Sequence, residues 1–283
     1  LKIWNEEFSE EEVISWSCYS NCDDNLIAHW MFDKGEGTIL HDHSGNRLHG
    51  EIFGATWWGP VVAGCMDSLA INYNENANVN NECDYPDNGD YLLSFDEDYH
   101  RVELPYQISE GLTSLTFMAW FYANDNQSEY SNIIQQDNGS NQSFHIRYQN
   151  GNNEFIYAFN AGQGGAGYSI SPPSFNEWHH VAISWDGANV RFYLDGEEIG
   201  NSDVSGIISG QQPIYIGNWQ EQEAFSGKID NVQYWNIGLS ESQIQSLMYL
   251  SPDDSENGLV ANWKFNSGEG DILYDHSGNQ NHG

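Results

Sequence analysis

Three alternating oxygen donors stand in a short turn near the start of the chain: Asp42, Ser44 and Asn46 of the sequence DHSGN. Carboxylate, hydroxyl and amide oxygens are ligands that Ca²⁺ prefers. If a sheet brings Asp230 of the sequence GKIDNV close to this turn, the four residues would hold Ca²⁺, and we predict this site. The alternative is an Asx-turn, in which the side-chain oxygens accept hydrogen bonds from the turn itself.

Sugar binding needs exposed aromatic rings for stacking and polar side chains that bond hydroxyl groups. One loop, GNWQEQE, offers Trp219 and Gln220, and a second turn offers Tyr130, Asn132 and Asp137. We predict that these five residues form a carbohydrate-binding site.

The four cysteines fall into two close pairs, Cys18 with Cys22 and Cys65 with Cys83. Such spacing fits two local disulfides better than a zinc site. The second pair bounds an Asn-rich insert, residues 63–86, and closing that loop stabilises the fold by about 3 kcal/mol in the chain-entropy model. Disulfides favour an exported protein, so we expect a secreted or cell-surface location.

Catalytic arrangements are harder to find. Polysaccharide hydrolases of one relevant type place two carboxylates on one strand as E-x-D-x-x-E. The nearest match, Glu82 to Asp87, ends in Asp and contains Pro, which excludes a central strand. His179 and His180 are adjacent in a strand and point to opposite faces, so they do not easily share a metal. No Ser-His-Asp set stands out from chance, and we predict that the protein is not an enzyme.

Short runs of alternating apolar and polar residues must position these groups. They are bounded by Gly, Asn, Asp and Pro and predict antiparallel strands; examples are LTFMAWFY, FHIRYQ, EFIYAF, WHHVAISW, VRFYL and KIDNVQYW. One helix is predicted at residues 239–250, where Ser240 and Gln243 form a capping box. The middle of the chain is therefore an all-β sandwich with one short C-terminal helix.

The chain also repeats itself. Residues 26–50 and 259–283 are identical at sixteen of twenty-five positions, and LKIWNEEF at residue 1 aligns with VQYWNIGL at residue 232. A self-match at nearly constant offset indicates a tandem array. We predict that residues 1–22 are the tail of a preceding repeat, 24–252 a complete domain and 258–283 the start of a following repeat. The two end pieces could compete for edge positions or pair with each other, but we expect both to fray.

Charge restricts the partners. The chain has 42 Asp and Glu against 8 Lys and Arg, a net charge of −34, which repels nucleic acid and anionic membranes and attracts cations. No apolar run is long enough for a transmembrane helix.

Several motifs together resemble the laminin G-like branch of the concanavalin A-like lectin/glucanase superfamily. They are LIAHWMFDKGEG with DHSGNRLHG, then LTFMAWFY, NEWHHVAISWDGANVRFYLDGEEIG and FSGKIDNVQYWNIGLSESQI. The cysteine insert resembles a separate motif, GC-D-x-A-x-N-Y-N, of secreted proteins. The resemblance implies an antiparallel jelly-roll sandwich of two sheets, often with a structural calcium, but no single function.

We therefore expect a non-catalytic carbohydrate-binding or adhesion module of a large secreted repeat protein, stabilised by Ca²⁺. Its expected partners are a polysaccharide or glycoconjugate and neighbouring repeats, without nucleic acid or membrane insertion. The alternatives are a purely structural spacer repeat and an accessory or degenerate domain of a polysaccharide hydrolase.

Overall fold

Two compact units make up the chain. The computed structural model describes residues 1–5, 7, 25–96, 99–136, 144–162, 164–208, 212–218, 223–253 and 256–283. The N-terminal unit comprises residues 1–63 and 76–79, and the C-terminal unit comprises residues 64–75 and 80–283.

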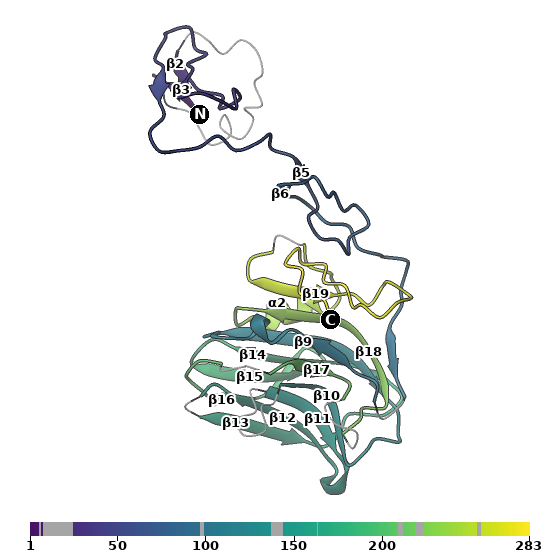
Figure 1. Cartoon of the computed structure of the whole chain (residues 1–283). Helices are drawn as coiled ribbons and strands as arrows, with labels where there is room; N and C mark the ends of the chain where they lie inside the picture. The colour runs from purple at the N-terminus through teal and green to yellow at the C-terminus, as the bar shows by residue number, and fades with distance from the viewer. Residues whose placement is uncertain are drawn as a thin grey trace. The chain divides into compact units, whose positions relative to one another are not determined.

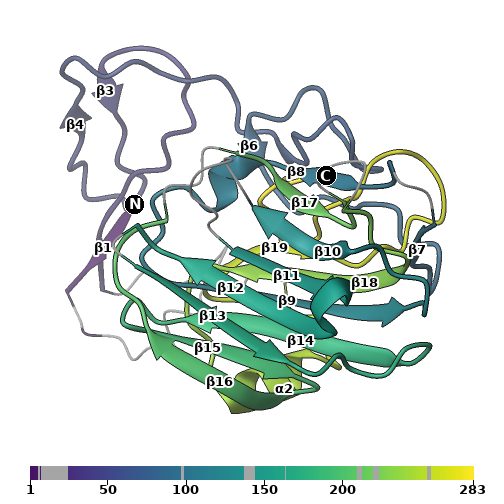
Figure 2. The same cartoon turned by 90° about the horizontal axis from the view of Figure 1, so that it is seen from below.

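The C-terminal unit is a sandwich of two large antiparallel sheets, which lie as two layers in Figures 1 and 2. One sheet has the order β13 (Gly165–Ile170), β12 (Glu154–Asn160), β11 (Phe144–Gln149), β10 (Tyr130–Gln136), β17 (Ile214–Ile216), β8 (Val102–Leu104). The other has the order β16 (Glu197–Asp203), β15 (Asn189–Leu194), β14 (Trp178–Trp185), β9 (Leu115–Ala123), β18 (Gly227–Trp235), β19 (Leu259–Trp263), with β7 (Leu93–Phe95) also paired to β18. The predicted all-β sandwich is confirmed.

Alternation along β9 explains how the layers hold together. Phe117 and Phe121 point between the sheets, where the ring of Phe121 stacks on Phe155 at 5.7 Å. Met118 lies on the opposite face of β9 and packs in a second cluster. Because successive side chains of a strand alternate between faces, one strand serves both clusters.

The second cluster is covered by the predicted helix, α2 (Glu241–Leu247), confirmed with its capping box at Ser240 and Gln243. Ile244 is fully buried and packs with Met118 and Trp235. Two 3-10 turns, Tyr106–Ile108 and Asn150–Asn152, complete the described helical structure. No helix in the described ranges is long and apolar enough to cross a membrane.

The C-terminal segment differs from its sequence-based placement. Residues 258–283 were expected to lie outside the sandwich and to fray, yet β19 is hydrogen-bonded along β18 from Val232 to Trp235. The other edge of β18 pairs with β9. Trp263 is fully buried in the main core. The expectation of fraying at this end was wrong because β19 pairs along an edge of β18 and also buries Ala261 and Trp263 in the core.

The N-terminal unit contains four short strands, β1 (Lys2–Trp4), β2 (Leu26–His29), β3 (Ile39–Leu40) and β4 (Gly50–Glu51), paired β1 with β2 and β3 with β4. Residues 24–50, which were expected to begin the sandwich, thus belong to a separate unit. The division of the chain into units falls within β5 (Ala63–Gly64) and β6 (Val79–Asn80), which pair with each other.

The cysteine insert has the predicted Cys65–Cys83 disulfide. It packs on the last residues of the chain: Tyr85 stacks on Tyr274 with ring centroids 5.6 Å apart, and Cys65 and Tyr85 form a small buried cluster. Cys18 and Cys22 lie outside the described residues, so their disulfide stays a prediction.

Candidate functional site

The DHSGN turn is organised around the carboxylate of Asp42. Its Oδ1 accepts the backbone N–H groups of His29 and Ser44 at 2.8 and 2.9 Å. Its Oδ2 accepts the Ser44 hydroxyl at 2.8 Å and the backbone N–H of Leu48 at 2.9 Å. Although desolvation raises it, these hydrogen bonds together hold the pKa of Asp42 well below its ordinary value.

This bonding does not fit a Ca²⁺ site. The four acceptor positions of the Asp42 carboxylate are taken by N–H and O–H donors. The Asn46 amide donates to the Leu26 and Ile27 carbonyls at 3.0 and 2.9 Å. The geometry is that of the alternative, a turn whose side chains serve its own backbone.

Asp230, the fourth expected ligand, belongs to the C-terminal unit. Its Oδ1 accepts the backbone N–H of Asn231 at 2.8 Å. Burial, together with the negative charge of Asp90, raises the pKa of Asp230 to about 6. Within the described ranges no three His, Cys, Asp or Glu side chains gather into a group that could hold a metal. Ca²⁺ binding by this chain therefore stays a prediction.

Two of the five predicted sugar-binding residues lie on β10. The half-buried ring of Tyr130 carries the guanidinium of Arg147, 4.9 Å from its centroid. Asn132 is fully buried, and its amide donates to the Glu223 carboxylate at 2.8 Å. Trp219, Gln220 and Asp137 lie outside the described residues. The grouping of the five stays a prediction.

A cleft of about 710 Å³ opens in the C-terminal unit, between residues 91–103 and the segment 265–283. Two exposed aromatic side chains line it, Tyr91 at 48% and Tyr99 at 68% exposure. Its polar and charged lining residues are Ser94, His100, Arg101, Glu103, Ser267, Glu269 and Asp271.

The two walls of the cleft are joined by specific contacts. Asn88 donates from its backbone to the Asn266 carbonyl at 2.9 Å and from its amide to the Ser267 carbonyl at 2.7 Å. The ring of Tyr91 packs closely against Gly268, whose φ is +73° and where an added Cβ atom would come within 2.6 Å of the ring. Only glycine allows both that backbone conformation and that close approach.

Contacts also orient the lining residues Tyr99, His100 and Arg101. His100 Nδ1 lies 3.0 Å from the Asp96 carboxylate, and the His100 ring packs edge-on against Tyr99 at 5.0 Å. The guanidinium of Arg101 lies over the ring of Tyr215 at 5.5 Å. A cation held over an aromatic face in this way is oriented without losing its hydrogen-bond donors.

Sequence reasoning missed this cleft because its walls come from opposite ends of the unit. The sequence repeat assigns Gly268 to another domain than Tyr91 and Tyr99, whereas the structure brings the three residues to one cleft. The close spacing of Tyr91, Tyr99 and Arg101 around the apolar strand residues 92–95 was the available signal.

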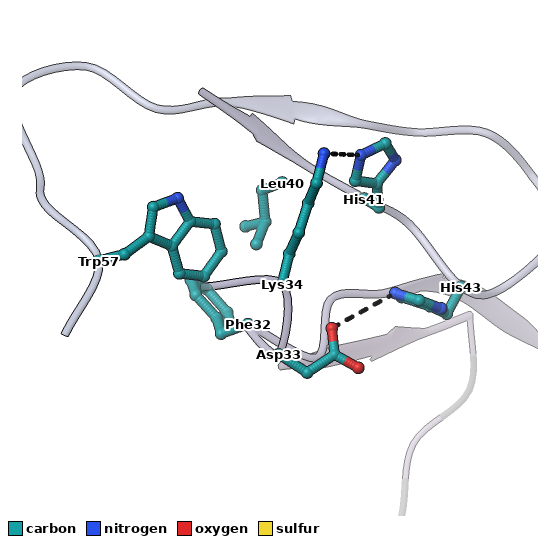
Figure 3. Close-up of a pocket in the computed structure, with 7 residues that line it drawn as sticks. All are labelled: Phe32, Asp33, Lys34, Leu40, His41, His43 and Trp57. Carbon is teal, nitrogen blue, oxygen red and sulfur yellow. Dashed lines mark hydrogen bonds and ion pairs between the residues drawn. The ribbon is translucent and has the colours of Figure 1, made fainter. Parts of the chain in front are cut away.

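The N-terminal unit has a smaller hollow, about 350 Å³ in volume, shown in Figure 3. Phe32, Leu40 and Trp57 surround it, and the indole of Trp57 donates to the Gly37 carbonyl at 2.6 Å. Polar side chains complete the lining: Asp33, Lys34, His41 and His43.

A serine, a histidine and an aspartate do meet at the start of β14. Ser174 Oγ lies 3.0 Å from His179 Nε2, and His179 Nδ1 lies 2.8 Å from Asp195 Oδ2. The Ser174 hydroxyl donates to Glu177 at 2.7 Å, however. Its single proton is therefore directed to a carboxylate and not to the imidazole, which a nucleophilic serine would need as its base.

Comparison with known families agrees with the sandwich. Residues 96–245 match a laminin G family model described as the concanavalin A-like lectin/glucanases superfamily. The chain belongs to this superfamily. One solved structure, a putative carbohydrate binding protein from Bacteroides ovatus, superposes with a TM-score of 0.55 at 21% identity, covering 75% of this chain and 63% of that one.

Curated relatives match over shorter stretches. C-reactive protein of Danio rerio is 31% identical over 120 residues, which is 38% of this chain and 50% of the relative. The sushi, von Willebrand factor type A, EGF and pentraxin domain-containing protein 1 of Rattus norvegicus is 34% identical over 106 residues, 32% of this chain and 3% of the relative. The chain thus spans half or less of these relatives.

Proposed function

We propose that the C-terminal unit is a non-catalytic carbohydrate-binding module and that the cleft beside Tyr91 and Tyr99 is its binding site. The observation that carries the proposal is the pair of exposed tyrosines that line the cleft together with charged and hydroxyl side chains. Aromatic faces stack on the apolar face of a sugar ring, and the polar groups bond its hydroxyls.

The negative charge of the cleft favours a neutral or amino-sugar ligand over an anionic one. Arg101 is opposed by three carboxylates, Glu103, Glu269 and Asp271, and the whole chain carries a net charge of −34. An anionic polysaccharide would be repelled by this field. The ligand we propose is a neutral or amino-sugar polysaccharide or glycoconjugate.

The superfamily membership and the name of the Bacteroides ovatus protein support a carbohydrate ligand. The Cys65–Cys83 disulfide supports a secreted or cell-surface location, where such ligands occur. A non-catalytic role is favoured because the cleft is lined by aromatic side chains that are suited to binding, and because the Ser174 proton is held by Glu177.

A glycan array followed by calorimetric titration of the best ligand tests the proposal. Tyr99→Ala should weaken binding about tenfold or more, which corresponds to roughly 1.4 kcal/mol of lost stacking. Tyr249→Ala is the matched control, because Tyr249 is 75% exposed and lies outside the cleft. Tyr130→Ala tests the site predicted from the sequence, and each titration is repeated with Ca²⁺ and with a chelator.

Loss of binding in Tyr130→Ala with full binding in Tyr99→Ala would move the site to β10. If no glycan binds to the folded protein, the module is a spacer, and the proposal fails. Release of reducing sugar from a bound polysaccharide would instead favour the hydrolase alternative.

A further inference from the structure

The repeated sequence is repeated in structure. In the N-terminal unit β1 pairs with β2 as Lys2↔His29, Ile3↔Ala28 and Trp4↔Leu26, with a bulge between Ile3 and Trp4. In the sandwich β18 pairs with β19 in the same register and with a bulge at the same place, between Tyr234 and Trp235. We call residues 26–50 the N-terminal block and residues 259–283 the C-terminal block.

The hydrogen bonds inside the two blocks also coincide. Asp275 accepts hydrogen bonds from backbone and side-chain donors as Asp42 does. The Asn279 amide donates to the two strand carbonyls of its own block that are equivalent to those bonded by Asn46. The indole of Trp263 donates to the Asn281 carbonyl as Trp30 does to the corresponding carbonyl. The N-terminal unit is therefore folded as the last part of such a sandwich.

The two copies differ in what covers them. Phe265 is 5% exposed and Tyr234 is buried in the sandwich core, whereas Phe32 is 55% exposed and Ile3 is 44% exposed. These two apolar side chains are therefore exposed in the N-terminal unit, whereas the sandwich buries their equivalents. Phe32 also lines the hollow in Figure 3, together with Leu40.

Backbone pairing shows the same difference. In the sandwich the edge of β18 away from β19 pairs with β9, joining Tyr234 to Phe117 and Trp235 to Thr116. In the part of the chain that the structure describes, β1 pairs with β2 alone. The edge of an antiparallel strand presents N–H and C=O groups that another strand can bond.

We propose that the exposed face of the N-terminal unit that carries Ile3 and Phe32, together with the edge of β1, binds the body of a second sandwich of the same kind. This body is a segment equivalent to residues 51–231. That occupant supplies a β9-like strand to the edge of β1 and apolar side chains equivalent to Val102 and Leu104 to the N-terminal block. In the C-terminal unit these two side chains lie so close to Gly283, the equivalent of Gly50, that an added Cβ atom there would come within 2.7 Å of each. The completed sandwich would link consecutive repeats through one shared chain.

The test extends the full chain upstream by a second copy of residues 51–231 joined to Leu1. This junction restores the order of the repeat, because Leu1 occupies the position of Val232. Hydrogen exchange is measured for peptides covering residues 1–50 in the extended and the original chains. The amides of β1 and β2 should exchange at least about tenfold more slowly in the extended chain, because they become interior to a sheet.

Matched substitutions give a second measurement. Ile3→Asp places a charge where the occupant's core would lie, so in the extended chain it should remove the calorimetric transition of the added copy. In the original chain it should leave the melting of the C-terminal unit unchanged. Met31→Asp is the control, because Met31 is 50% exposed and its counterpart in the C-terminal block is Lys264.

Equal exchange of residues 1–50 in both chains would overturn the proposal, whether or not the added copy folds. So would an Ile3→Asp variant of the extended chain that melts as the unsubstituted one does.

Discussion

The imidazole of His282 lies 2.7 Å from the carboxylate of Asp67, 215 positions earlier in the chain. Nδ1 of His282 accepts the backbone N–H of Asp275 at 2.9 Å, so that nitrogen carries no proton. A neutral imidazole then has its hydrogen on Nε2 and donates it to Asp67. Tyr85 donates a second hydrogen bond to the same carboxylate oxygen at 2.7 Å. The cysteine insert is thereby fastened to the C-terminal block.

Asp67→Ala should destabilise the C-terminal unit by about 1–3 kcal/mol, because two donors in a part-buried site lose their acceptor. Urea unfolding measures the loss. Asp84→Ala, an exposed carboxylate of the same insert, is the control and should have little effect. Equal losses in the two variants would show that the Asp67 contacts contribute nothing specific.

The Asp67 contribution should depend on pH. Desolvation raises the pKa of Asp67, but hydrogen bonds from Leu69, His282 and Tyr85 outweigh it and hold the pKa below the ordinary 3.8. An acid whose folded pKa is lowered stabilises the fold above its unfolded pKa and loses this effect as pH falls through the folded pKa. The difference between Asp67→Ala and the unsubstituted chain should therefore be constant near neutrality and vanish in strong acid, below pH 3.8.

Asp275 and Asp42 allow the same substitution in two settings. Asp275→Asn puts an amide N–H₂ among donors from Asn262, Ser277 and Asn281, and it should cost about 2–3 kcal/mol in calorimetric melting of the sandwich. Asp42→Asn makes the same local change in the N-terminal unit and should leave that transition in place. The prediction fails if both variants shift the main transition equally.

Asp230→Asn should stabilise the C-terminal unit at pH 7.5, on the order of 1 kcal/mol. Burial and Asp90 raise the pKa of Asp230 to about 6, so the folded state favours the protonated form. This stabilisation is complete below the unfolded value of 3.8 and is lost as pH rises to about 6, so the variant should show no gain in acid.

The Asp230 variant also separates the calcium prediction from its alternative. A cation bound at Asp230 would stabilise the ionised carboxylate and reverse the sign. If Asp230→Asn melts below the unsubstituted chain in Ca²⁺, and a chelator removes the difference, Ca²⁺ binds there after all. If the melting temperature of the C-terminal unit is the same with Ca²⁺ and with chelator, the calcium hypothesis for this unit is wrong.

Deleting residues 254–283 should abolish cooperative melting of the sandwich. The deletion exposes the β18 edge at Val232–Trp235 and removes the buried side chains of Ala261 and Trp263 from the core. Loss of one large buried aromatic side chain alone costs about 3–5 kcal/mol. Deleting residues 1–50 is the control, and it should leave that melting within a few degrees. A cooperative transition in the chain that lacks residues 254–283 would contradict the assignment of β19 to this sheet.

The sequence by itself determined the fold class and most strands. Alternation in LTFMAWFY and WHHVAISW is a local property, because a strand that borders a core must place apolar residues at every second position. Ser240 and Gln243 determine a helix start through contacts within four residues. Cys65 and Cys83 were paired correctly because their separation along the chain is short.

Only the tertiary structure decided where the repeat is divided and where the cleft lies. The two blocks carry nearly the same sequence, so local pattern cannot say that β19 belongs to the sandwich while β2 does not. Pairing across β18 decides it, and that pairing joins residues brought together by the whole sheet. Tyr91 and Gly268 come into contact for the same reason, because the sheet brings distant segments of the chain together. The oxygens of DHSGN likewise indicate a cation site in the sequence, but in the structure backbone N–H groups donate to the Asp42 carboxylate. The sequence shows which atoms can accept a hydrogen bond but not which donors already occupy them.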